Sequence, residues 1–225
     1  MEYVEIARTE TERGEVVLRE RREEGAPSVL ELRVNGVFVM DTRETTSERA
    51  LARAALALVD RPRRVLVGGL GLGFTAHEVL ADARVEQCTV VEIEEPLVAW
   101  MRDGTVPHGP RLLADERLTV AVGDVAQVLE ESHQDSWDLV LLDVDNGPGH
   151  LVHEANAALY GAAFLEVAQR ATRGVLVVWS AAEAPELETA MRAVLGNAEA
   201  RPYDVTLGER DETYWLYVGR VASGA

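Results

Sequence analysis

The chain has 225 residues, 47% of them hydrophobic and 27% charged, so it can bury a sizeable core and is not compositionally disordered. Its 39 acidic and 22 basic residues give a formal net charge of −17, and all 22 basic residues are arginine. A field of that sign repels phosphate backbones and anionic lipid, which argues against nucleic-acid and membrane-surface partners. It allows a cationic partner, although strong negative charge also serves solubility alone.

The cysteine content and the N-terminal segment further limit the class of protein and its expected compartment. Cys88 is the only cysteine and lies in an apolar run, which excludes a disulfide framework and a cysteine-based metal site. The first ten residues, MEYVEIARTE, lack both a basic segment and a long apolar one, and no stretch approaches about 18 uninterrupted apolar residues. We therefore expect a cytoplasmic protein.

Residues 1–45 are predicted to form a small N-terminal antiparallel β domain. The Asn35-Gly36 pair is a hairpin signal, since both residues tolerate positive φ. Exposed edges of such hairpins are compatible with a homodimer. The predicted strands are short runs rich in Val, Leu and Ile with partial alternation, at residues 3–7, 14–22, 29–34 and 36–42.

Residues 46–225 alternate between predicted strands and helices, and Ser47 is placed to cap the first helix. Short, fully apolar strands alternating with helices indicate a parallel sheet covered on both faces. The predicted strands are residues 63–69, 87–93, 117–122, 138–144 and 174–180. The predicted helices are residues 47–59, a helix through His77 and Leu80, and residues 96–103, 125–131, 153–171 and 185–195.

Two further strand-like runs, residues 203–207 and 214–220, end the chain. The connection between them is too short for a helical crossover, so it predicts an antiparallel hairpin. A five-stranded parallel sheet extended by such a hairpin is the arrangement expected of a transferase that uses S-adenosylmethionine (AdoMet). The predicted fold class is therefore α/β, with a seven-stranded Rossmann-like sheet behind the N-terminal β domain.

The sharpest local motif is VLVGGLGLGFT at residues 65–75, a glycine-rich turn between a strand and a helix. Glycine suits this position because the chain turns sharply and its backbone approaches a ligand closely, while the helix N-terminus presents free N–H groups. The glycines expected to bind the ligand are Gly68, Gly69, Gly71 and Gly73.

Two ligand classes are compatible with this loop. Gly71, Gly73 and Ala76 fit the dinucleotide pattern G-x-G-x-x-A. However, the strand is expected to end at Gly68 and the first close turn begins at Gly69, which favours a nucleoside-binding register.

Acidic residues follow the next two predicted strands. Glu92 lies at the tip of the strand after the glycine loop, where a carboxylate can accept hydrogen bonds from both ribose hydroxyls. Asp124 follows the third strand and has two interpretations: an acceptor for an adenine amino group, or the N-cap of the next helix. The sequence alone does not separate them.

The fourth predicted strand ends in LLDVDNGPGH, residues 141–150. Ligands of open α/β sheets bind at the carboxyl ends of the strands, so Asp143 and Asp145 are expected to face the ligand. His150 and His153 follow, where a substrate wall would lie. The remaining histidines, His77, His108 and His133, are not spaced with a carboxylate cluster as metal ligands are, and we predict no metal.

A set of short segments carries a family resemblance: VFVMDT, SERALA, VLVGGLGLG, VVEIE, VGD, LLDVDNGP, and ALY followed by Phe164. In these segments the chain resembles the spermidine synthase (polyamine aminopropyltransferase) family over nearly its full length. The resemblance implies a β-strand domain before a Rossmann-like AdoMet-type domain. It also implies a ribose-binding Glu92, an adenine-side Asp124 and a catalytic Asp143.

The departures from the family pattern concern the donor and amine pockets. The family's glycine loop usually reads GGGDGG, and its Asp helps bind the amino group of decarboxylated AdoMet; here Gly71 stands at that position. The Gln and the Tyr-His pair that line the family's donor and amine pockets are absent, since Thr45 and Thr46-Ser47 stand near their positions. The family's Asp-Pro element is likewise replaced, by residues 145–148. Without the loop Asp, repulsion against the α-carboxylate of ordinary AdoMet disappears. At roughly 4 Å and an effective dielectric of about 20, that contact would cost about 4 kcal/mol.

The leading hypothesis is therefore an AdoMet-dependent methyltransferase that acts on a small amine-bearing, cationic molecule. The residues expected to bind the donor are Gly68, Gly69, Gly71, Gly73, Glu92 and Asp124. Those expected to orient and deprotonate the acceptor are Asp143, Asp145 and His150.

Three alternatives remain open. The first is an aminopropyltransferase that uses decarboxylated AdoMet and a polyamine, because Asp143 is retained. The second is a non-catalytic nucleoside-binding protein. An NAD-dependent oxidoreductase comes last, since the terminal hairpin and the lack of an obvious hydride-site set of His, Lys and Tyr argue against it.

Overall fold

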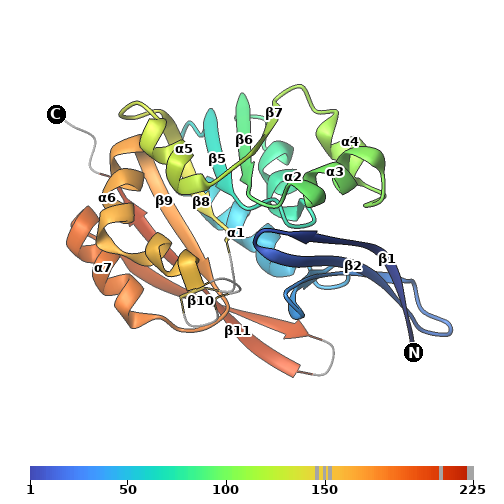
Figure 1. The fold of residues 1–225 in the computed structure, drawn as a ribbon. Coiled ribbons are helices and arrows are strands. Elements are labelled where there is room, and N and C mark those ends of the chain that lie inside the picture. Colours follow the sequence, from blue (N-terminus) through green and yellow to red (C-terminus); the bar gives the residue numbers. More distant parts are fainter. Residues whose placement is uncertain (145–146, 149–150, 152–153, 208–209, 222–225) are drawn as a thin grey trace.

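The computed structural model describes residues 1–144, 147–148, 151, 154–207 and 210–221, and the chain begins with a four-stranded antiparallel sheet (Figure 1). Its strands follow one another in space in their order along the chain. They are β1 (Glu2–Thr11), β2 (Gly14–Arg22), β3 (Val29–Val34) and β4 (Val37–Asp41). The predicted N-terminal antiparallel sheet is confirmed.

The hairpin between β3 and β4 turns at Asn35 and Gly36, whose φ angles of 51° and 75° confirm the predicted turn. The Asn35 side chain also fastens the neighbouring turn between β1 and β2. Its Oδ1 accepts from the Glu15 N–H at 2.9 Å, and its Nδ2 donates to the Arg13 carbonyl oxygen at 3.1 Å. Arg13 is thereby held at one end of the small sheet.

The second sheet has seven strands in the order β10-β11-β9-β8-β5-β6-β7. Its strands are β5 (Arg64–Gly68), β6 (Gln87–Glu92), β7 (Leu118–Val122), β8 (Trp137–Leu142), β9 (Thr172–Ser180), β10 (Glu199–Leu207) and β11 (Arg210–Arg220). The strands from β5 to β9 pair in parallel, and β11 and β10 add an antiparallel hairpin at the β9 edge. This is the predicted Rossmann-like arrangement.

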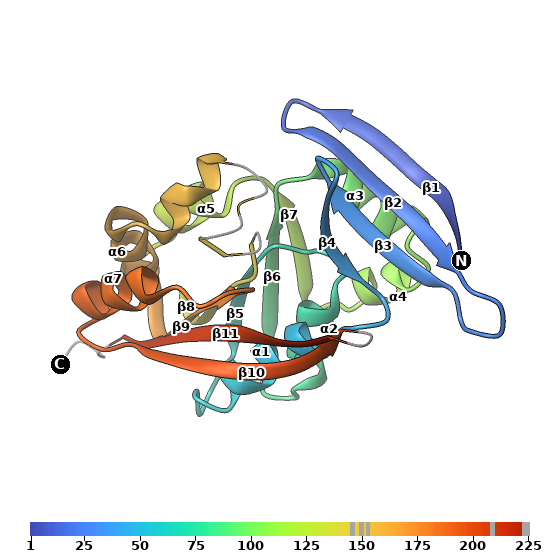
Figure 2. The same ribbon diagram turned by 90° about the horizontal axis from the view of Figure 1, so that it is seen from below.

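Helices cover both faces of the larger sheet. They are α1 (Thr46–Leu56), α2 (Phe74–Ala81), α3 (Glu95–Asp103), α4 (Gly109–Leu113), α5 (Val125–Glu131), the 3₁₀ helix η1 (Glu154–Tyr160), α6 (Ala162–Ala171) and α7 (Pro185–Leu195). Side chains of β5 alternate between the faces: Val65 and Val67 pack with α1 to α4, and Leu66 packs with α5 to α7. Both ribbon views place the four-stranded sheet beside α2 and α3 (Figures 1 and 2).

Three local predictions need correction. The single helix expected over residues 153–171 is divided, because Gly161 adopts an extended conformation between η1 and α6. Ser47 is not the N-cap of α1: the helix already begins at Thr46, with Thr45 as its cap, so Ser47 lies buried in the first turn. The short helix α4 was not predicted at all.

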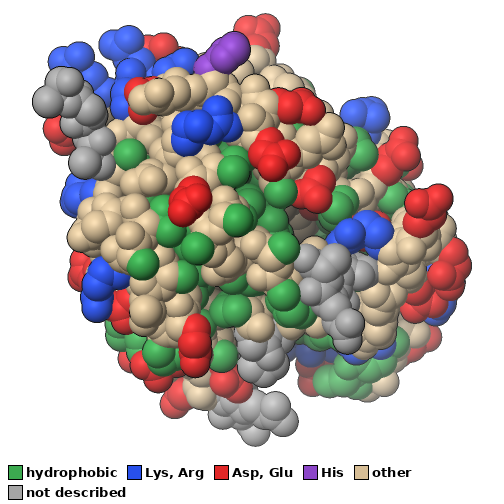
Figure 3. Space-filling model, turned by 60° about the vertical axis from the view of Figure 1, so that its left-hand side comes forward, with side chains coloured by type: hydrophobic (Ala, Val, Ile, Leu, Met, Phe, Trp, Pro, Cys, Tyr) green, Lys and Arg blue, Asp and Glu red, His purple; other side chains and the backbone are tan. Residues whose placement is uncertain are grey.

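Charged side chains of both signs are visible on the surface. On the face shown in Figure 3, acidic side chains are spread over the molecule and interspersed with arginines. Within the described part of the chain, no helix is both long enough and apolar enough to cross a membrane. Most of the −17 charge is therefore general surface charge, and only the acids inside a cleft need a specific explanation.

Candidate active site

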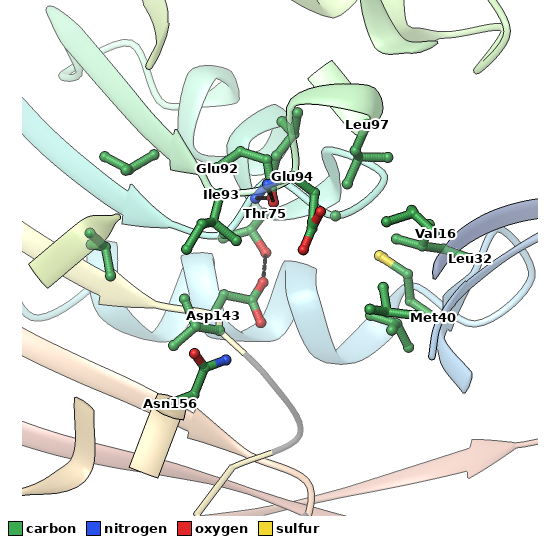
Figure 4. A pocket seen from close by; sticks show the side chains of 18 of the residues that line it. Val16, Leu32, Met40, Thr75, Glu92, Ile93, Glu94, Leu97, Asp143 and Asn156 are labelled. Atoms are coloured by element: carbon green, nitrogen blue, oxygen red, sulfur yellow. Dashed lines mark hydrogen bonds between the residues drawn. The ribbon is translucent and has the colours of Figure 1, made fainter. Parts of the chain in front are cut away.

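The carboxyl ends of the parallel strands open into a cleft of about 1140 Å³, counting the part open to solvent. The four-stranded sheet closes its opposite side with apolar side chains, among them Val16, Leu32 and Met40 (Figure 4). Three residues predicted from successive strand ends line this cleft together: Glu92, Asp124 and Asp143. Tertiary structure thus brings the predicted acids to one site.

The glycine loop is shaped by close contacts within the protein. Gly69 has a φ of +94°, and a Cβ there would lie 2.1 Å from the Asp143 carbonyl oxygen. Gly71 has a φ of +50°, and a Cβ there would lie 2.6 Å from the Met40 sulfur. That sulfur also accepts a hydrogen bond from the Leu72 N–H at 3.1 Å. Met40 therefore occupies the space in which a side chain at position 71 would begin.

The remaining two loop glycines mark the ends of the turn. Gly68 is the last residue of β5, as predicted, and Gly73 caps the N-terminus of α2. The loop backbone between them lines the cleft at Gly69, Leu70 and Gly71.

Glu92 ends β6 with both carboxylate oxygens held by backbone amides. Oε2 accepts from the Leu70 N–H and Oε1 from the Glu94 N–H, each at 2.8 Å. Burial raises the pKa of Glu92, and these two amide bonds work against the rise. The Gly71 N–H also favours the charged form, and of the carboxylate's roughly four lone pairs these three amides leave one that can accept a hydrogen bond from a ligand hydroxyl.

Asp124 resolves one of the two interpretations left open by the sequence. Its side chain accepts from the Ala126 N–H at 2.8 Å, so it caps α5. The residue is exposed and also lines the cleft. The capping role is present, and a ligand contact from the same residue stays a prediction.

Asp143 follows β8 directly and points into the cleft (Figure 4). Its Oδ2 accepts from the Thr75 hydroxyl at 2.7 Å, which fixes the carboxyl against the start of α2. Burial raises the pKa of Asp143 to about 6, although the Thr75 bond opposes that rise. The other two predicted acceptor-side residues, Asp145 and His150, lie outside the described residues.

Sequence reasoning missed Glu48, a second carboxyl at this end of the cleft. The Ser47 hydroxyl donates to Glu48 Oε2 at 2.8 Å. Burial raises the pKa of Glu48 to about 7, and the negative charge of Asp143 contributes to the rise. A signal was available in the sequence: Glu48 lies at helical spacing from the buried residues Leu51, Ala52 and Ala55.

Arg13 was also missed, and no sequence signal could have found it. Its Nε donates to Glu94 Oε1 at 3.2 Å and its Nη2 to Asn156 Oδ1 at 3.3 Å, across 81 and 143 positions of chain. The Thr11 hydroxyl donates to Glu94 Oε2 at 3.3 Å. The turn between β1 and β2 is therefore joined to two separate walls of the cleft.

Aromatic side chains from the C-terminal half complete the wall. Trp179 lines the cleft, and its buried Nε1–H has no hydrogen-bond partner. Its ring meets the ring of Tyr214 edge-on, with 5.1 Å between centroids. Among the residues that the structure describes, no group of three His, Cys, Asp or Glu side chains is arranged to hold a metal ion.

The strand order, the glycine loop and the strand-end acids place the protein among Rossmann-like α/β folds with a terminal antiparallel hairpin. The chain belongs to the spermine/spermidine synthase domain family, whose pattern it matches over residues 44–199. Over 98% of its length it superposes on 74% of spermidine synthase from Thermotoga maritima, with a TM-score of 0.78 at 16% identity. At that identity the likeness establishes the fold.

Sequence relatives carry two different activities in their names. The chain is 29% identical to polyamine aminopropyltransferase 2 of Hyperthermus butylicus, over 69% of this chain and 50% of that protein. It is 28% identical to putrescine N-methyltransferase 2 of Nicotiana tabacum, over 57% of this chain and 35% of that protein. The chain thus spans half or less of the length of these curated relatives.

Proposed function

We propose that the protein is an AdoMet-dependent methyltransferase that acts on a small amine. The observation that carries this proposal is the contact between Gly71 and Met40. Gly71 has no side chain where the family's loop carries a carboxylate, and the Met40 thioether fills the space in which one would begin, so nothing at position 71 repels the α-carboxylate of AdoMet. The relatives named putrescine N-methyltransferases support methyl transfer within this family.

The residues of the cleft fit such a donor. Glu92 lines the cleft and keeps an acceptor lone pair, which suits a ribose hydroxyl. Apolar side chains such as Ile93 and Val125 offer a surface for an adenine ring. When bound, AdoMet supplies a methyl group on a positively charged sulfur, and the acids of the cleft favour that charge.

Asp143 is placed to hold the acceptor. A carboxylate next to a bound amine keeps its nitrogen aligned with the transferable carbon and accepts a hydrogen bond from it. The Thr75 hydroxyl stops the Asp143 side chain from rotating away, since it binds Oδ2 at 2.7 Å. Catalysis in this site is mainly alignment and charge stabilisation by residues already in position.

Calorimetric titration with AdoMet and with decarboxylated AdoMet tests the donor. We expect AdoMet to bind at least about tenfold more tightly. Clear preference for the decarboxylated donor would overturn the methyl-transfer proposal.

A paired variant tests the same contact directly. Gly71→Asp alone should destabilise the fold, because its Cβ collides with the Met40 sulfur. Adding Met40→Ala makes room for the new carboxylate, and the double variant should then shift its preference towards decarboxylated AdoMet. The control is Met40→Ala alone, which should retain the preference for AdoMet.

The second candidate is an aminopropyltransferase, favoured by the retained Asp143 and by the relatives of that name. Incubation with putrescine and decarboxylated AdoMet tests it, with formation of a longer polyamine as the positive result. A non-catalytic nucleoside-binding role predicts donor binding but no turnover with any amine.

A further inference from the structure

Two carboxyl groups, those of Glu48 and Asp143, share one end of the cleft. They belong to elements far apart in sequence, α1 and the segment after β8. Thr75 brings their two segments together, since its hydroxyl donates to Asp143 Oδ2 at 2.7 Å and lies 3.5 Å from the Glu48 backbone carbonyl oxygen. The two carboxyls are close enough for the Asp143 charge to raise the pKa of Glu48.

Among the described residues, no cationic side chain is paired with either member of the pair. Arg13 is the one basic residue in the described lining of the cleft, and its guanidinium is bonded to Glu94 and Asn156. Within the described ranges, neither Glu48 nor Asp143 forms an ion pair, and each is held by a hydroxyl instead. Like charges in a partly buried site repel, so a cationic ligand between the two carboxyls would be favoured.

The groups that face Glu48 from other elements are also acidic or neutral. Asp143 faces it from the end of β8, Glu44 from the segment before α1, and the Tyr214 phenol from β11. Burial and these acids raise the pKa of Tyr214 to about 12, so its hydroxyl stays protonated and does not compete for the ligand's proton near neutral pH.

We propose that Glu48 is a catalytic residue that takes the proton from an ammonium acceptor bound between it and Asp143. This proposal rests on the proposed transfer to an amine. The Glu48 carboxylate first accepts one proton, which leaves a neutral amine. The nitrogen lone pair then forms the bond to the transferred carbon while the carbon–sulfur bond breaks and its electrons stay on sulfur. The product leaves as an ammonium, and Glu48 returns its proton to solvent.

The two carboxyls are held differently. Asp143 Oδ2 is tied to the Thr75 hydroxyl of another element, α2, whereas the Glu48 side chain accepts from the hydroxyl of its own neighbour, Ser47. Burial raises the pKa of Asp143 to about 6, and burial together with the Asp143 charge raises that of Glu48 to about 7, so both lie near neutral pH. A general base is most effective when its pKa lies near the working pH. Asp143 then holds the amine in position, and Glu48 exchanges the proton.

Amine binding can be measured without turnover, so that the role of Glu48 is tested independently of which donor the protein uses. The protein is loaded with S-adenosylhomocysteine and titrated with putrescine by calorimetry, in two buffers of different ionisation enthalpy, between about pH 6 and pH 9. Wild type should bind putrescine with proton exchange. Glu48→Gln should bind about tenfold more weakly and lose that exchange, while Asp143→Asn should bind weakly but retain it.

The matched control is Glu44→Gln, which removes the same charge close to Glu48 from a residue outside the cleft lining. It should leave putrescine affinity unchanged within about twofold. Equal affinity and equal proton exchange in Glu48→Gln and wild type would overturn the proposal. If S-adenosylhomocysteine fails to bind, the proposed function fails instead, and titration with putrescine alone still tests Glu48.

Turnover gives a second readout. Glu48→Gln should lower the single-turnover rate by about a hundredfold and remove its rise with pH near neutrality. Glu48→Asp keeps a carboxylate and should restore part of the rate. A pH profile of wild-type shape in Glu48→Gln would show that the residue is only structural.

Discussion

The carboxyls of Glu92, Asp143 and Glu48 line one cleft and are held in two different ways. Glu92 is buried, while Asp143 and Glu48 are half-buried. Glu92 has both oxygens bonded to backbone N–H groups, so its position is set by the chain itself. Asp143 and Glu48 are each held by one side-chain hydroxyl, and they raise one another's energy when both are charged. The first arrangement suits rigid recognition of a ligand, and the second suits a group that must change its protonation state.

The largest effect on turnover should come from a substitution at the Asp143 and Glu48 carboxyls. Asp143→Asn keeps an acceptor for the Thr75 hydroxyl but removes the negative charge that we propose holds the amine. We expect turnover with amine acceptors to fall at least about a hundredfold while AdoMet affinity stays within about twofold. Product formation by mass spectrometry and donor calorimetry measure the two quantities. The control is Asp60→Asn at an exposed residue. Equal losses of turnover in the two variants would contradict a specific role for the Asp143 charge.

The same two carboxyls should make stability depend on pH. Their pKa values rise from 3.8 and 4.5 to about 6 and about 7, so the folded protein binds more protons than the unfolded chain between those values. Stability should therefore be highest at the acid side of this window and fall as pH rises from about 4 to about 7. Glu48 alone should account for a loss of up to roughly 3 kcal/mol in the free energy of unfolding.

Urea unfolding of wild type and Glu48→Gln across that window checks this dependence. The variant should lose less stability than wild type between acid and neutral pH, because glutamine does not titrate. Parallel curves for the two proteins would show that Glu48 titrates normally.

A smaller effect, on stability and on donor affinity, should come from a substitution of Glu92, the carboxyl held by backbone N–H groups. Glu92→Gln keeps one acceptor oxygen but turns an NH₂ group towards the N–H of either Leu70 or Glu94. Leaving a buried donor unpaired costs about 1–3 kcal/mol, and AdoMet affinity should fall about tenfold. Urea unfolding and calorimetry measure both. Glu95→Gln, at an exposed neighbour, is the control and should behave as wild type.

The smallest effect should come from the bridge made by Arg13. Arg13→Ala removes the link from the β1–β2 turn to Glu94 and Asn156. Because Arg13 is partly exposed, we expect the free energy of donor binding to change by only about 1 kcal/mol. The rate at which the bound donor reacts should stay unchanged. Arg22→Ala, at the more exposed end of β2, is the control. A large loss of turnover would place Arg13 in the chemistry itself.

Features that depend on residues close together in the sequence were predictable, and features that depend on contacts between distant residues were not. Strand–helix alternation and the hairpin at Asn35-Gly36 are local patterns, and the structure bears them out. The helix over residues 153–171 was wrong because one glycine divides an otherwise helical pattern. Glu48 could have been found, since its spacing on the buried stripe of α1 was visible, but surface acids at helical spacing are common.

The class of fold and the strand ends that carry Glu92, Asp124 and Asp143 are predictable from local patterns, because parallel strands must end at the same edge of a sheet. What those residues face depends on contacts between distant segments. The pairing of Glu48 with Asp143, the contact of Met40 with Gly71, and the reach of Arg13 to Glu94 all join distant segments. Such contacts depend on how the small sheet and α1 pack over the strand ends, and no local pattern encodes that packing.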